Sequence, residues 1–241
     1  MIHSSLQKLK THLKCLENKE IATHSQKFFK TGKGEYAEGD VFLGIRVPVL
    51  RKLVQHYRDL PVHDVTQMLK SKFHEERLLS LLILVAKFHK SNNKDKQVIY
   101  DCYLENTKFI NNWDLVDSSA EHIVGAYLKN RDKKPIYILA HSKDLWERRI
   151  SIISTFHFIR DNTFNDALMI SEILLHDTQD LIHKAVGWML REIGKRDISV
   201  LEVFLIKHYK EMPRTMLRYA IEKFPEERRQ RYLKGKLEIE M

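Results

Sequence analysis

Three tryptophans of this chain each lie one helical turn before a charged residue. Residues three or four positions apart share one face of an α-helix, so each indole is expected beside its charged neighbour. Indoles, a carboxylate and two guanidinium groups suit a surface that holds a sugar-phosphate backbone together with a cation. The spacing therefore indicates nucleic acid as the ligand. The three pairs are Trp113 with Asp117, Trp146 with Arg149, and Trp188 with Arg191.

The first pair is expected at the start of a helix. Asn112 is typical of an N-cap, because its side-chain oxygen can accept a hydrogen bond from the backbone of the first turn. Trp113 then opens the helix, and Asp114 at the second helical position is explained by the helix dipole. Asp117, at the fifth position, gains less from that dipole. We therefore take Asp117 as a candidate functional carboxylate, with a dipole-stabilising acid as the alternative.

Four stretches of the sequence resemble the AlkD-like family of DNA alkylation repair glycosylases, which are built from HEAT-like helical repeats. They are residues 42–48, 113–117, 146–149 and 184–192. The resemblance runs from about Phe28 to the basic C-terminal tail. It implies an all-α, right-handed solenoid of HEAT-like (ARM-type) repeats that forms a single domain over residues 1–241. It also implies a monofunctional DNA glycosylase that does not swing its target base into a pocket.

The resemblance gives individual residues a role. Asp117 aligns with the family's essential carboxylate, and Arg149 aligns with the phosphate-binding arginine beside it. Trp113 and Trp188 are expected to flank the deoxyribose, and Phe28 to contact the strand of the damaged nucleotide. We expect Trp113, Asp117, Arg149 and Trp188 to converge on the concave face of the solenoid. For the three aromatic residues, packing between helices is the alternative.

Further basic residues are expected to bind phosphates along the same face. The alternative for each is a solvent-exposed side chain that binds no ligand, which is the usual role of charged residues on helix surfaces. Trp146 is expected to pack between helices. Glycine inside a helix costs stability, so Gly187, just before Trp188, predicts that another backbone or helix approaches closely there. The additional expected DNA-binding residues are Arg148, Lys184, Arg191, Arg214 and Arg218.

A single carboxylate is enough to release a cationic purine. A purine alkylated at N3 or N7 already carries a positive charge and leaves as a neutral base, so no general acid has to protonate it. The remaining tasks are to stabilise an oxocarbenium-like sugar and to orient a water molecule. The faces of indole rings also favour cationic species. The resemblance implies double-stranded DNA containing 3-methyladenine or 7-methylguanine as the substrate, and no cofactor is expected.

Composition agrees with a polyanionic partner. The 241 residues include 41 Lys and Arg against 32 Asp and Glu, a formal charge of +9, which favours nucleic acid or an acidic membrane. The longest apolar stretch, residues 78–88, is too short to span a bilayer. Cys15 and Cys102 lack metal or redox spacing, and no His-Glu-x-x-His pair is present. We expect a cytoplasmic monomer that binds neither metal nor membrane.

Periodicity predicts about a dozen helices and no strand. Leu6, Leu9 and Leu13 recur at helical spacing. A second helix is expected over residues 18–30, followed by a glycine-rich loop over 31–41. Pro48, Pro213 and Pro225 are expected at first helical positions. The three tryptophans lie 33 and 42 residues apart, close to the length of a two-helix repeat.

Two features depart from the family pattern. Asn112 stands where well-known active relatives carry an aromatic residue, and the stretch 32–39 is longer than theirs. Both N-terminal helices are expected to be present, which favours a working enzyme. A catalytically silent HEAT-like DNA-binding protein is the first alternative. A helical scaffold for protein binding is the second, although it gives no reason for the basic charge.

Overall fold

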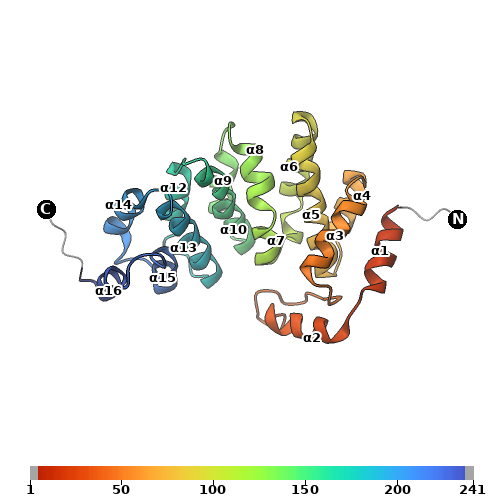
Figure 1. The fold of residues 1–241 in the computed structure, drawn as a ribbon, viewed down its shortest axis with the longest axis horizontal. Coiled ribbons are helices and arrows are strands. Elements are labelled where there is room, and N and C mark those ends of the chain that lie inside the picture. Colours follow the sequence, from red (N-terminus) through yellow and green to blue (C-terminus); the bar gives the residue numbers. More distant parts are fainter. Residues whose placement is uncertain (1–4, 237–241) are drawn as a thin grey trace. The chain divides into compact units, whose positions relative to one another are not determined.

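The computed structural model describes residues 5–236, and every regular element in that range is a helix (Figure 1). The one strand-like pairing there is an isolated bridge between Val41 and Phe73. The predicted all-α fold is confirmed. Within the described range, no helix is long and apolar enough to cross a membrane. The chain forms two compact units, the first ending at Tyr127 and the second starting at Leu128.

In the first unit, α5 is the central helix. It packs against α3, α4, α6 and α7 and against the turn η2. This is the arrangement of stacked helix pairs. The elements are α1 (Ser5–Cys15), α2 (Lys19–Phe28), α3 (Val47–Tyr57), α4 (Val62–Leu69), α5 (His74–Lys90), α6 (Asn93–Glu105), the 3₁₀ turn η1 (Thr107–Phe109), α7 (Trp113–Asp117) and the π-helical turn η2 (Glu121–Gly125).

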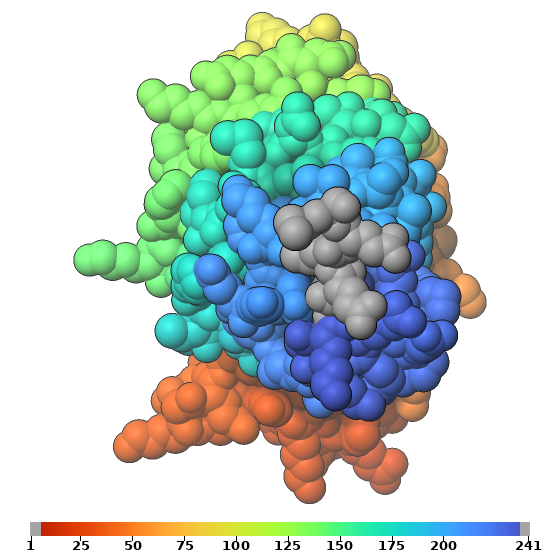
Figure 2. Space-filling model, turned by 90° about the vertical axis from the view of Figure 1, so that its left-hand side faces the viewer, coloured from red at the N-terminus to blue at the C-terminus, as the bar shows by residue number. Residues whose placement is uncertain are grey.

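The second unit also has a central helix. Helix α13 packs against α10, α12, α14 and α15. Figure 2 shows the surface of α14 and α16 in blue at the C-terminal end of this unit. The elements are α9 (Lys134–Ala140), α10 (Leu145–Ser154), α11 (Phe156–Arg160), α12 (Asn165–Ile173), α13 (Asp180–Gly194), α14 (Ile198–His208), α15 (Arg214–Ala220) and α16 (Glu226–Lys234); α8 (Ala126–Leu128) spans the boundary between the units.

Helix starts and apolar faces follow the sequence pattern closely. Leu6, Leu9 and Leu13 of α1 are buried, as their spacing predicts. Pro48 lies in the first turn of α3, where its missing N–H costs nothing. Pro213 and Pro225 precede α15 and α16 by one residue rather than opening them. Their fixed φ still sets the direction in which each helix begins.

The connection between α2 and α3 is fixed by a buried carboxylate. Glu75, at the start of α5, accepts hydrogen bonds from the backbone N–H groups of Leu43, Gly44 and Ile45 at 2.8, 2.7 and 3.2 Å. Gly44 has a φ of +81°, and a Cβ there would lie 2.0 Å from the carbonyl oxygen of Asn18. Only glycine fits such a close approach. The stretch 42–48 is therefore the joint that places α2.

Candidate active site and nucleic-acid surface

Helix α7 begins as the sequence predicts. Asn112 is buried, and its Oδ1 accepts a hydrogen bond from the backbone N–H of Trp113 at 2.8 Å. Its Nδ2 donates to Oδ2 of Asp40 at 3.4 Å. The helix is five residues long, and the chain soon enters the π-helical turn η2. Such turns are often found at functional sites. Asn112 thus serves both as cap and as a link to the loop before α3.

Asp117 lines a groove of about 470 Å³ in the first unit. Ser118 and His122 follow it along the same wall, and Arg51 of α3 lines the groove with them. Arg51 is exposed and brings a permanent positive charge to the lining. The groove therefore offers a carboxylate and a guanidinium to one ligand. Its remaining lining comes from Val54, Leu82, Val85, Ala86 and Glu121.

A buried phenol fixes the turn behind Asp117. Tyr103 of α6 is fully buried, and its hydroxyl lies 3.0 Å from Oγ of Ser119. Burial raises the pKa of Tyr103, and the nearby Asp117 carboxylate raises it further, while the Ser119 hydrogen bond opposes the shift. Tyr103 therefore remains a neutral hydrogen-bonding group. Its contact holds the end of α7 against α6.

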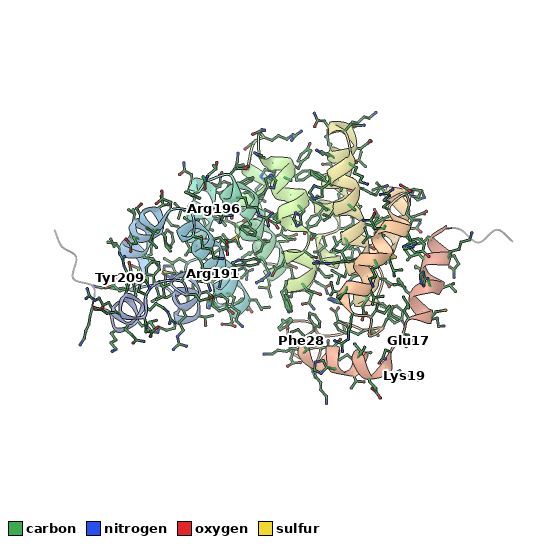
Figure 3. The ribbon with its side chains drawn as sticks, in the orientation of Figure 1. Glu17, Lys19, Phe28, Arg191, Arg196 and Tyr209 are labelled. Atoms are coloured by element: carbon green, nitrogen blue, oxygen red, sulfur yellow. The ribbon has the colours of Figure 1, made fainter. Side chains whose placement is uncertain are left out.

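The indole of Trp113 belongs to an aromatic cluster at the end of α2. Its ring stacks on Phe29, with centroids 5.4 Å apart and planes inclined by 24°. Phe28 meets Trp113 edge-on at 6.1 Å. Phe28, labelled in Figure 3, keeps 58% of its surface exposed, whereas Trp113 is half-buried. The structure thus brings two of the predicted site residues together, and adds Phe29 to them.

Asp114 lies in the first turn of α7, as predicted for an acid that complements the helix dipole, and it also contacts a buried histidine. Its Oδ2 lies 2.8 Å from Nε2 of His74, which is 2% exposed. Asp40 lies 3.3 Å from the other ring nitrogen, and Arg77 donates to Asp40 at 2.7 Å. Burial alone would lower the pKa of His74, but Asp114 and Asp40 raise it to about 9. Asp114 therefore ion-pairs with a charged, buried imidazolium.

In the second unit, Trp188 lies half-buried on α13. Its ring centroid is 5.6 Å from that of Phe156, and its Nε1 donates to Glu192 at 3.2 Å. The close approach predicted at Gly187 is confirmed, because a Cβ there would lie 2.5 Å from the carbonyl oxygen of Met216. The neighbour is helix α15. Trp188 therefore follows a position at which α13 lies directly against α15.

Arg149 is not at the surface. It is 5% exposed, and its Nη1 donates to the carbonyl oxygen of Leu181. The side chain therefore ties α10 to the start of α13. Trp146, one turn earlier, is buried, as expected for a packing residue. The phosphate contact predicted for Arg149 stays a prediction.

The other predicted phosphate ligands fall into two groups. Arg214 and Arg218 of α15 are exposed, and Arg214 donates one hydrogen bond to the carbonyl oxygen of Leu233 at 2.8 Å. The remaining three, among them Arg191 on α13 (labelled in Figure 3), have carboxylate partners. These ion pairs are Arg148 with Asp177, Lys184 with Asp180, and Arg191 with Glu222.

The sequence matches the family described as DNA alkylation repair enzyme over residues 9–224. The chain belongs to this family. A structure from Enterococcus faecalis, described as a predicted DNA alkylation repair enzyme, is similar to it with a TM-score of 0.66 and 14% sequence identity. The similarity covers 86% of this chain and 96% of that chain. At this identity the likeness shows a shared fold. No curated protein matches the chain.

Membership of the DNA alkylation repair enzyme family confirms the resemblance drawn from the four sequence stretches and supports a role in alkylation repair. In this family member, Trp113 and Asp117 lie in the first unit, and Arg149 and Trp188 in the second. Their convergence on one face stays a prediction. Arg51 could not be found from the sequence, because no short motif links α3 to α7. The same holds for His74, whose partner Asp114 lies 40 residues away.

Proposed function

We propose that this protein is a monofunctional DNA glycosylase that excises cationic N3- and N7-alkylated purines from double-stranded DNA. The observation that carries the proposal is the groove lined by Asp117. It combines the Asp117 carboxylate, one helical turn from the half-buried indole of Trp113, with the exposed Arg51 in the lining of one groove. This is the set of groups that a cationic sugar and its flanking phosphate require.

In the proposed reaction the N-glycosidic bond breaks first. Its electron pair goes to the alkylated purine, which thereby becomes neutral and leaves without protonation. The sugar develops positive charge at C1′, which the Asp117 carboxylate stabilises. Water then attacks C1′ and gives up one proton to Asp117, which passes it to the solvent. The products are the free alkylated base, such as 3-methyladenine or 7-methylguanine, and an abasic site.

The indoles have the second role in this proposal. The accessible part of Trp113 faces the sugar, and Trp188 of the second unit is the other proposed sugar-facing ring. Aromatic faces attract cations by about 0.5–2 kcal/mol, more when the site is desolvated. This supports discrimination by charge, so the base itself need not enter a pocket. Neutral lesions are expected to be poor substrates, because their release requires a general acid.

Phosphate binding is proposed to begin at the exposed arginines. Arg51, Arg214 and Arg218 are accessible without rearrangement. Arg148, Lys184 and Arg191 can exchange a carboxylate partner for a phosphate oxygen, which bidentate guanidinium groups bind well. Arg149 is proposed to hold α10 in place and to reach phosphate only if its surroundings open. No metal or other cofactor has a part in this scheme.

One experiment tests the proposal directly. Purified protein in excess is incubated with duplex DNA methylated at N3 of adenine and N7 of guanine, and released bases and abasic sites are counted together. Equal amounts of free base and abasic site, with no strand cleavage, are expected. Strand cleavage would contradict a monofunctional enzyme. Binding without release would instead favour the catalytically silent DNA-binding protein.

A further inference from the structure

A buried imidazole lies at the centre of the first unit's aromatic cluster. The ring of His74 stacks on Phe42, with centroids 4.6 Å apart and planes inclined by 23°. Its centroid also lies 5.0 Å from that of Phe29. Buried charges are costly unless paired and hydrogen-bonded. A histidine kept charged in such surroundings therefore indicates a specific task.

His74 is connected to Trp113 through two sets of contacts. The first is the contact of its Nε2 with Asp114, the residue that follows Trp113 in α7. The second is the aromatic stack, in which Phe29 lies against both His74 and Trp113. One route fixes the backbone that carries the indole, and the other fixes the indole ring. Together they leave Trp113 little freedom to rotate or to shift.

We infer that His74 is a positioning residue that holds Trp113 and the start of α7 in the orientation that base excision requires. The inference deepens the proposed glycosylase function and rests on it. His74 touches neither DNA nor water at the reaction centre in this scheme. It acts through Asp114 and Phe29. A misplacement of about 1 Å at a reacting group can cost about a hundredfold in rate.

The protonation state of His74 decides whether its ring can donate hydrogen bonds to Asp40 and Asp114 at the same time. Both ring nitrogens carry a proton in the imidazolium, but only one does in the neutral ring. Asp40 and Asp114 can therefore both accept a hydrogen bond only from the charged form. The groups that face His74 are these two carboxylates, the guanidinium of Arg77 on its own helix, and the rings of Phe29 and Phe42. At neutral pH the imidazolium is the stable form.

The test uses three variants, His74→Gln, Asp114→Asn and the double variant. Each single variant is expected to slow single-turnover base release by about 10- to 100-fold, with the Kd for duplex DNA changed less than about threefold. The double variant should be no slower than the slower single variant, because both changes break the same link. Leu69→Ala, in the buried face of α4, is the control. It lowers stability without touching α7 and should release base at the wild-type rate.

A second readout is independent of activity. With 5-fluorotryptophan incorporated and the resonance of Trp113 assigned through Trp113→Phe, the ¹⁹F shift reports the surroundings of that ring. It should move in His74→Gln and Asp114→Asn but not in Leu69→Ala. In the wild type it should titrate near pH 9, and in His74→Gln it should not.

The two readouts separate the failure of this inference from the failure of the proposed function. An unchanged Trp113 resonance in His74→Gln would overturn the positioning role, whatever the activity. Wild-type base release by His74→Gln would overturn it as well. If the wild-type protein released no base, the glycosylase proposal would fail, and the ¹⁹F shifts alone would decide whether His74 positions Trp113.

Discussion

The ring of Phe29 stacks on the indole of Trp113, with centroids 5.4 Å apart and planes inclined by 24°. Phe29 caps the C-terminal end of α2 and Trp113 opens α7, so the stack joins two elements that are far apart in the sequence. Part of the indole is therefore covered by Phe29. Trp113 is half-buried, and its accessible part is the part proposed to contact DNA.

The Asp117 carboxylate gives the most direct prediction. Asp117→Asn keeps the size of the side chain but removes the charge that is proposed to stabilise the sugar cation. Losing one well-placed electrostatic contact typically slows the chemical step by about 100- to 1,000-fold. Affinity for DNA should stay the same or rise slightly, because a negative charge near the phosphates is gone. Single-turnover release of 7-methylguanine measures the effect.

The control for this change has to leave α7 intact. Asp114→Asn is unsuitable, because Asp114 pairs with His74. Asp101→Asn on α6 removes an equal charge from an exposed position outside the groove, and should leave the rate unchanged. If Asp117→Asn released base as fast as the wild type, Asp117 would not be the catalytic carboxylate.

The fold and the start of the site could be predicted because the relevant signals are local. Asn112 predicts the start of α7, because an N-cap residue hydrogen-bonds only to the helical turn that follows it. The leucines of α1 reveal their buried face through spacing alone. Gly187 revealed a close contact because glycine inside a helix has a cost that packing must offset. The sequence did not show that the neighbour is α15.

The rest of the site depends on which helices become neighbours. Arg51 and Asp117 lie 66 positions apart along the chain, and they share a groove only because α3 and α7 both pack against α5. The pairing of His74 with Asp114 arises in the same way. Arg149 depends on helix neighbours as well, because its burial against Leu181 of α13 could not be seen from its position one turn after Trp146. Sequence periodicity predicts which face of a helix is buried, but it does not predict which other helix packs against that face.

Salt dependence tests the proposed phosphate contacts. Each contact should contribute a slope of about −0.9 in a plot of log affinity against log salt, and we expect about three to six contacts. Arg218→Glu should weaken binding to duplexes of every sequence and make the slope shallower by about one contact, because phosphate contacts read no bases. Lys94→Glu, an exposed change on α6, is the matched control. A DNA affinity that does not change with salt concentration would favour a protein-binding scaffold.

Stability should depend on pH through His74. Its pKa is raised in the folded state to about 9, from an ordinary value of 6.5. The stabilisation is therefore fully present below pH 6.5, declines as the pH rises, and is lost once the pH passes about 9. The slope in that window is at most on the order of 1 kcal/mol per pH unit. Urea unfolding of the wild type and His74→Gln between pH 6 and 10 checks this, and parallel curves would contradict it.

Phe28 is the residue for which a DNA contact and ordinary packing make different predictions. It is 58% exposed, so Phe28→Ala should change the free energy of unfolding little, by about 0.5 kcal/mol. If the ring stacks on a base or sugar of the damaged strand, the same change should weaken binding by about 1–3 kcal/mol. Fluorescence anisotropy with a labelled duplex measures the binding, and thermal unfolding measures the stability.

Two further variants separate stacking from apolar contact. Phe28→Leu keeps most of the apolar surface but loses the aromatic face, so it should bind almost as weakly as Phe28→Ala. Val203→Ala trims another exposed apolar side chain, on α14, and should bind as the wild type does. If Phe28→Ala bound DNA with wild-type affinity and unfolded more easily, the ring would serve only to pack against Trp113.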